Sequence, residues 1–141
     1  MTIEAEGDWS ERAGGGAIAV EFSGPTLECT LIRAVEGFAE SHVDLHPSVA
    51  VSSHPIEVKA TTPSALLLGV LEACLRSRHE GCVAVGLSDP VLRGDHLAAE
   101  LDTVDAGHPH VRSGLGPVVS WHEVTLEPGP DGGWTGRIVA R

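Results

Sequence analysis

Basic residues are scarce in this sequence of 141 residues. Nine lysines and arginines stand against twenty aspartates and glutamates, which gives a formal net charge of −11. Because proteins bind nucleic acids largely by neutralising phosphates with lysine and arginine, this charge argues against direct binding of RNA or DNA. The negative charge suits a basic partner protein, because opposite charges accelerate the encounter of two proteins. A simpler interpretation is that the acidity keeps the protein soluble and needs no partner.

The sequence also lacks the features of secreted and membrane proteins. Its three cysteines, Cys29, Cys74 and Cys82, are an odd number without close pairing, which argues against a disulfide framework. The longest apolar run, residues 65–71, is too short to cross a membrane. The first residues are acidic where a signal peptide would carry bases. We therefore expect a cytoplasmic protein with reduced cysteines and no membrane attachment.

Motifs of the common enzyme classes are missing as well. The sequence contains no GxSxG, HExxH or CxxC pattern. The three glycines at 14–16 precede a predicted strand, whereas a dinucleotide-binding loop follows a strand and opens a helix. Gly132 and Gly133 are explained by turn formation. Nothing in these patterns supports catalysis, so we expect a protein that is not an enzyme.

Hydrophobic periodicity predicts two helices and six strands. Thr26 and Thr62 are expected to cap the helices, which end near Glu40 and before Gly81. The strands are predicted at 17–22, 55–60, 82–87, 96–104, 118–126 and 134–140. This order, strand, helix, strand, helix and four strands, favours an α+β fold. Both helices are expected to pack on one face of a mostly antiparallel sheet of about six strands.

The predicted domain organisation is simple. Residues 1–16 are acidic and then glycine-rich, with little apolar periodicity, and are predicted to form a flexible N-terminal arm. Residues 17–141 are predicted to form a single domain, because no linker or internal repeat divides them.

Histidines are the candidate functional residues. His42 and His46 have the i, i+4 spacing of zinc-binding helices, and His108 and His110 could both reach one metal ion. Exposed loop histidines are the simpler interpretation of both pairs. His122 differs because it lies inside a predicted strand. It could transfer protons or bind metal, but we favour a framework histidine that is hydrogen-bonded at the edge of the core.

The C-terminal hairpin resembles that of the archease family. Residues 117–123 and 131–134 look like the strand with its histidine, the acidic turn and the Gly-Gly-Trp stretch with which archeases end. Residues 24–28 are similar to the family's Gly-x-Thr-Leu-Glu helix start, and His110 resembles the histidine that closes the loop before the last strands. The resemblance runs from about residue 17 onward. The chain is identified as a divergent member, similar to actinobacterial-type archeases.

The resemblance implies an accessory, chaperone-type protein of tRNA splicing and RNA repair. Archeases assist RtcB-type tRNA ligases by promoting their guanylylation and multiple turnover. They use a site for a divalent cation such as calcium, which is built from carboxylates. The implied partner is therefore a protein, an RNA ligase of the RtcB type, and the chain itself is implied to be neither an enzyme nor a direct binder of nucleic acid.

The metal-binding motif of the family is largely missing here. Its Asp-His-Thr-Ala-Asp motif projects onto the segment that begins at Ala13 and ends at Ala17, and the aspartate near the family's C-terminus projects onto Arg141. A hard cation needs several anionic oxygen ligands. The implied metal site is therefore predicted to be lost, and no cofactor is expected. Asp8 or Glu11, in a shifted register, are alternative ligands.

Two other functions stay open. The chain could be a small histidine-based metal-binding protein or enzyme in which His108, His110 and His122 converge. It could also be an interaction module unrelated to RNA ligation.

Overall fold

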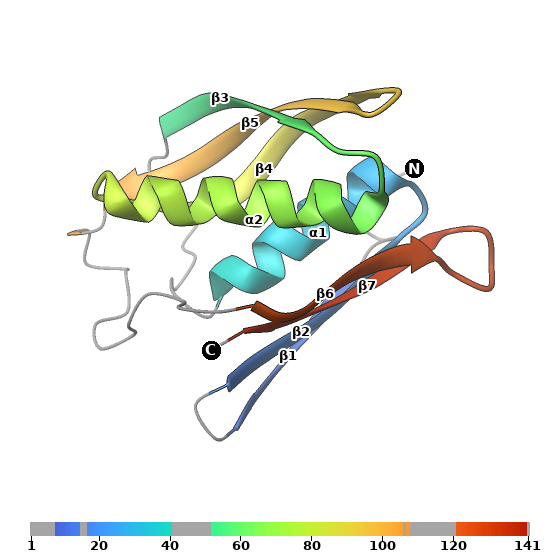
Figure 1. Ribbon diagram of the computed structural model, residues 1–141. Helices are drawn as coiled ribbons and strands as arrows, with labels where there is room; N and C mark the ends of the chain where they lie inside the picture. The colour runs from blue at the N-terminus through green and yellow to red at the C-terminus, as the bar shows by residue number, and fades with distance from the viewer. Residues whose placement is uncertain (1–7, 15–16, 41–51, 106, 108–120, 141) are drawn as a thin grey trace.

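The computed structural model describes residues 8–14, 17–40, 52–105, 107 and 121–140 (Figure 1). Helices and strands follow one another along these residues in a mixed order. They are β1 (Asp8–Gly14), β2 (Ala17–Gly24), α1 (Leu27–Glu40), β3 (Ser52–Lys59), α2 (Pro63–His79), β4 (Cys82–Arg93), β5 (His96–Asp105), β6 (Trp121–Pro128) and β7 (Trp134–Ala140).

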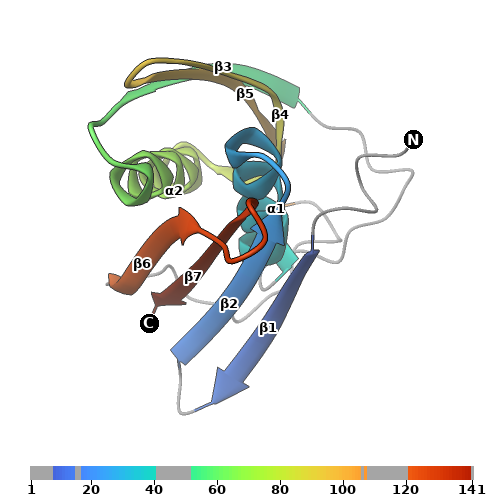
Figure 2. The same ribbon diagram turned by 90° about the vertical axis from the view of Figure 1, so that its right-hand side faces the viewer.

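The strands form two antiparallel sheets. The first has the order β1-β2-β7-β6 and the second the order β3-β5-β4. Helices α1 and α2 lie between the two sheets, and each contacts strands of both (Figure 2). The predicted α+β class, two helices and antiparallel pairing are confirmed. The single sheet of about six strands with both helices on one face is wrong, because periodicity shows which face of a strand is buried but not which strands pair.

The hydrophobic core lies on both sides of the helices. A helix between two sheets needs a wider apolar surface than one that covers a single sheet, and both helices have it. The buried apolar residues of α1 are Leu31, Ala34, Val35, Phe38 and Ala39, and those of α2 are Leu66, Leu67, Val70, Leu71, Ala73 and Cys74. They pack against Val20, Phe22 and Ile138 of the first sheet and Leu97 and Leu101 of the second.

Both helices begin at the threonine predicted from the sequence. The Oγ1 atom of Thr26 accepts a hydrogen bond from the backbone N–H of Cys29 at 3.1 Å. The Oγ1 atom of Thr62 accepts one from the N–H of Ala65 at 3.2 Å, and Pro63 follows at the first helical position. Neither helix in the part that the structure describes is long and apolar enough to cross a membrane.

Residues 8–14 form a strand and not part of an arm. They make up β1, which pairs with β2 from Asp8 opposite Ser23 to Gly14 opposite Ala17. The prediction of a flexible arm over residues 1–16 is therefore wrong for these seven residues. The reason is that β1 is an edge strand, which pairs through its backbone and shows only weak apolar alternation in its sequence.

Strand β4 also extends beyond its predicted end at Leu87. It continues to Arg93 through an irregular stretch between Ser88 and Val91, where the register with β5 shifts. Asp89 has a φ angle of 51° in this bulge. The Asp-Pro pair at 89–90 signals a bulge inside a strand here, since a bulged residue needs no partner in the ladder of hydrogen bonds.

Candidate functional site

One end of the four-stranded sheet collects the positions that the archease resemblance singled out. Ala13 pairs with Ile18, Ile18 pairs with Ala140, and Ala140 pairs with Trp121, so these four residues form one row across all four strands. Ala17 precedes Ile18 and pairs with Gly14. Segments from both ends of the chain therefore meet at this end of the sheet.

His122 lies in β6 beside this row, as the sequence predicted. The register between β6 and β7 shifts between Trp121 and Glu123, which marks a β-bulge at His122. A bulge interrupts the regular alternation of side chains.

The residues at this end of the sheet do not fit the divalent cation that the resemblance implies. The side chains of Ala13 and Ala17 are methyl groups and contain no oxygen, while a hard cation takes oxygen ligands. Within the described ranges, no group of three or more histidine, cysteine, aspartate or glutamate residues could hold a metal ion. No step of the function is therefore assigned to a metal here.

Several of the other candidates lie outside the described residues. They are His42, His46, His108, His110 and Arg141. The hypotheses that involve them stay predictions.

A second surface, not found from the sequence, is the outer face of the four-stranded sheet. Both helices pack on its inner face, and the outer face of β2, β7 and β6 carries no described element (Figure 2). The more exposed side chains alternate with buried ones along β2 and β7. Glu21 is exposed between buried Val20 and Phe22, and Arg137 is exposed between Gly136 and Ile138.

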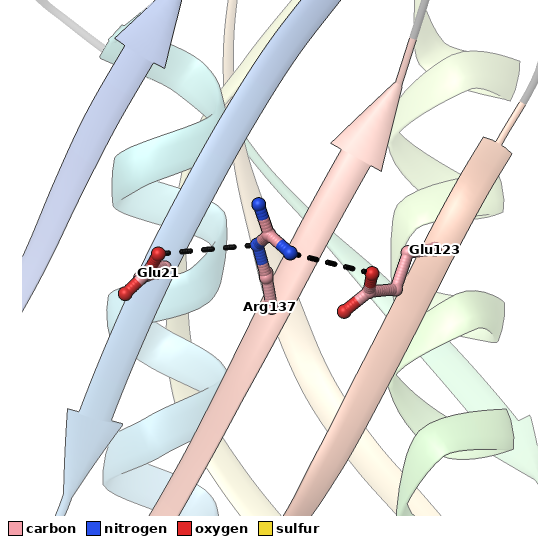
Figure 3. Close-up of polar contacts among 3 residues, drawn as sticks. All are labelled: Glu21, Glu123 and Arg137. Carbon is pink, nitrogen blue, oxygen red and sulfur yellow. Dashed lines mark hydrogen bonds and ion pairs between the residues drawn. The ribbon is translucent and has the colours of Figure 1, made fainter.

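Arg137 lies at the centre of this face between two glutamates (Figure 3). Its Nε atom is 3.9 Å from Oε1 of Glu21 on β2, and its Nη1 atom is 3.5 Å from Oε1 of Glu123 on β6. One guanidinium group therefore links three neighbouring strands. The side chains of Arg137, Glu21 and Glu123 are 47%, 55% and 39% exposed, respectively. Ion pairs in such positions stabilise a fold by only about 0–1 kcal/mol. Their main effect is on the charge of the face.

A shallow hollow of about 280 Å³ follows the same face. It is lined by Glu21, Glu123, Thr125, Glu127, Thr135, Gly136 and Arg137. The hollow thus contains three carboxylates and one guanidinium, and it is acidic. The sequence could not reveal this arrangement, because β2 and β6 are far apart in the chain and become neighbours of β7 only in the folded sheet.

A larger pocket of about 510 Å³ adjoins the hollow where β6 turns into β7. It is lined by Ser23 and Gly24 at the end of β2, by Pro25 after it, by residues 129–133 of the turn, and by Trp134 and Thr135 at the start of β7. Thr135 lines both depressions. The C-terminal hairpin therefore contributes to both depressions through its strands and its turn.

The fold was compared with known proteins. No family model and no curated protein matches the sequence. Among solved structures, the chain is similar to the solution structure of protein 1598 of Methanobacterium thermoautotrophicum, with a TM-score of 0.71 and 16% identity. The match covers 94% of this chain and 96% of that one. Protein 1598 is an archease-family protein, and the likeness shows that the present chain has an archease-like fold.

Proposed function

We propose that the chain is an archease-like accessory protein that assists an RtcB-type RNA ligase and has no catalytic site of its own. The observation that carries this proposal is the archease-like fold, which extends over 94% of the chain. The order of motifs in the sequence, with the Thr-Leu-Glu helix start at Thr26 and the Gly-Gly-Trp turn at Trp134, agrees with it.

The charge of the chain supports a protein partner. An enzyme that joins RNA ends must hold phosphates and therefore needs basic surface. A protein of net charge −11 is repelled by the RNA and attracted to such a surface. Complementary charge of this kind raises the rate of association and helps to set orientation.

The route of the assistance is direct contact. Ala13 and Ala17 supply no carboxylate ligands for a cation at the end of the four-stranded sheet. The proposed role therefore depends on surfaces that the chain presents to the ligase. A bound metal ion is not required for it.

The proposal is tested with the RtcB-type ligase of the same organism. The ligase is mixed with an excess of the chain, and guanylylation of the ligase is followed over many turnovers. Stimulation that saturates with the concentration of the chain is expected. If the chain neither binds nor stimulates the ligase, the proposal is contradicted. A His122→Ala variant should stimulate as well as the wild type, because His122 is assigned to the framework.

The histidine-based alternative has its own test. It requires His108 and His110, which lie outside the described residues. Zinc titration of the wild type and of a His110→Ala variant decides it. Tight binding that the variant loses would support this alternative.

A further inference from the structure

We infer that the outer face of the four-stranded sheet is a docking surface for an extended basic segment of a partner protein. The surface is the hollow between Glu21, Glu123 and Glu127 with Arg137 at its centre. The inference goes beyond the proposed function because it assigns the face and the chemistry of the docked segment. It rests on the proposed function only where the partner is taken to be the ligase.

The outer face of the sheet is open in the described part of the chain. Antiparallel sheets commonly pack one face on the core and leave the other to solvent. Here α1 and α2 contact the sheet from the inner side and lie behind it in the close-up (Figure 3). No other part of the described chain covers β2, β7 and β6 on the outer side (Figure 2). A segment of another protein can therefore reach the hollow without rearrangement of the described helices and strands.

The carboxylates of this face are regularly spaced along the strands. Cross-strand pairing arranges the outward positions of β2, β7 and β6 in three successive rows. They are Ala19–Val139–Glu123, Glu21–Arg137–Thr125 and Ser23–Thr135–Glu127. Each row holds one glutamate, and neighbouring rows are two residues, or about 7 Å, apart. Glu123 and Glu127 lie on β6 and Glu21 lies on β2, on the other side of β7. An extended chain above β7 with a base at every second residue repeats at the same distance, so each base has one carboxylate beside it, on alternate sides.

Arg137 already pairs with two of these carboxylates. It is the only base among these nine outward positions, and its guanidinium contacts Glu21 and Glu123 in two adjacent rows. The guanidinium of Arg137 therefore occupies the position in which a basic side chain of the partner would bind. Exposed ion pairs are weak because water screens them. An incoming arginine or lysine can displace Arg137 from either glutamate at little cost.

The charge of the face selects this occupant over two others. A nucleic acid would bring phosphates toward three carboxylates and be repelled. A second copy of the chain, docked through the same face, would bring two acidic hollows together, and like charges opposed across an interface weaken binding. A basic, extended protein segment has the complementary charge and the matching repeat.

The test uses a synthetic peptide of alternating arginine and threonine, titrated into the full chain by calorimetry at physiological salt. A Glu21→Gln/Glu123→Gln/Glu127→Gln variant removes the carboxylates of the hollow. A control, Glu72→Gln/Glu80→Gln/Glu100→Gln, changes the net charge equally on α2, just after it and on β5. All six glutamates are exposed or half-buried, so both variants keep the fold.

The expected result is specific to the face. The hollow variant should bind the peptide about tenfold more weakly or worse, and the control within about twofold of the wild type. Arg137→Gln should bind it more tightly, because the internal competitor is gone. Equal weakening in both triple variants, or weaker binding by Arg137→Gln, would overturn the inference.

Other occupants are tested on the same proteins. Sedimentation showing a wild-type dimer that the hollow variant loses would make the face a self-interface. Direct binding of a single-stranded RNA to the wild type, measured without the peptide and lost in the hollow variant, would make it a nucleic-acid site. Either result overturns the inference. Failure of the wild type to stimulate the ligase, with peptide binding intact, contradicts the proposed function alone. The hollow variant could lose peptide binding and still stimulate the ligase as well as the wild type does. In that case the protein that docks on this face is not the ligase, and the peptide titration still decides the inference.

Discussion

The Oγ atom of Ser64 accepts a hydrogen bond from the backbone N–H of Leu126 at 2.9 Å. The two residues are 62 positions apart and join the first turn of α2 to β6. Strand β6 is an edge of the four-stranded sheet, where a backbone N–H would otherwise lack a strand partner. The serine hydroxyl, which is also 3.4 Å from the carbonyl oxygen of Leu126, takes the place of that partner.

Substitution of this serine should therefore weaken the fold. In Ser64→Ala, the N–H of Leu126 loses the only side-chain acceptor that it has among the described residues. The free energy of unfolding should therefore fall by about 1–2 kcal/mol. Urea denaturation measures the change. Ser77→Ala is the matched control on the same helix, because its hydroxyl only adds a bond to the carbonyl of Ala73 within α2. Equal losses in both variants would show that the bond to Leu126 contributes nothing.

The local parts of the fold could be predicted from the sequence, and its long-range pairing could not. The caps at Thr26 and Thr62 were predicted because a cap depends on residues within one turn. The contact of Ser64 with Leu126 depends on which strand edge lies beside α2, and periodicity contains no such information. The same reason explains why two sheets were predicted as one.

The candidate site shows the same division. The resemblance marked Ala13 and Ala17 as positions without metal ligands, and the structure adds that they lie in adjacent rows at one end of the sheet. The acidic hollow was not found, because Glu21 and Glu123 approach each other only through Arg137 of an intervening strand. In the sequence each is an ordinary outward glutamate of an alternating strand.

Gly136 of β7 is predicted to tolerate no side chain. A Cβ atom there would lie 2.5 Å and 2.6 Å from two ring atoms of Phe22, and as close to the carbonyl oxygen of Thr125. Overpacking of this kind displaces both the ring and the neighbouring strand, and Gly136→Ala should cost about 3 kcal/mol in the free energy of unfolding. Chemical denaturation measures it.

Gly86→Ala provides the control for this prediction. The nearest atom to its Cβ would be Oδ2 of Asp102 at 3.4 Å, at the limit of ordinary contact, so its effect should be small. A Gly136→Ala variant as stable as Gly86→Ala would contradict the close packing of β7 against Phe22.

The N-cap of α2 is expected to contribute measurably to stability. Thr62→Ala removes the acceptor of the Ala65 N–H and should lower the free energy of unfolding by about 1 kcal/mol. Thr61→Ala, at the exposed neighbouring position, is the control and should change it little. Thermal denaturation of both variants measures the difference. A cap without energetic effect would give the same midpoint for the two.

The chain is predicted not to bind calcium stoichiometrically. Ala13 and Ala17 offer no side-chain oxygen atoms where the family resemblance implies aspartates, and a hard cation needs several anionic oxygen ligands. Calorimetric titration with calcium chloride should give no saturable heat. Stoichiometric binding that is lost in Asp8→Asn or Glu11→Gln would instead establish a site with shifted ligands and contradict the prediction.

The buried thiol of Cys74 is expected to control stability at alkaline pH. Its burial among the apolar residues of α2 raises its pKa from 9.0 to about 12, although a backbone hydrogen bond acts in the opposite direction. Below pH 9 the thiol is protonated in both the native and the unfolded chain. Between pH 9 and 12 the unfolded chain releases the proton and the native chain keeps it. The free energy of unfolding should therefore fall there by about 1 kcal/mol per pH unit.

The composition of the chain makes this dependence measurable. There is no tyrosine and a single lysine, Lys59, so few other side chains titrate in the same range. Urea denaturation between pH 8 and pH 11 should show a clearly flatter dependence for Cys74→Ala than for the wild type. Cys82→Ala, which removes a half-buried thiol, is the control and should keep the wild-type slope. If Cys74→Ala and the wild type lost stability in parallel, the thiol of Cys74 would have to ionise in the native protein as readily as in the unfolded chain, which its burial opposes.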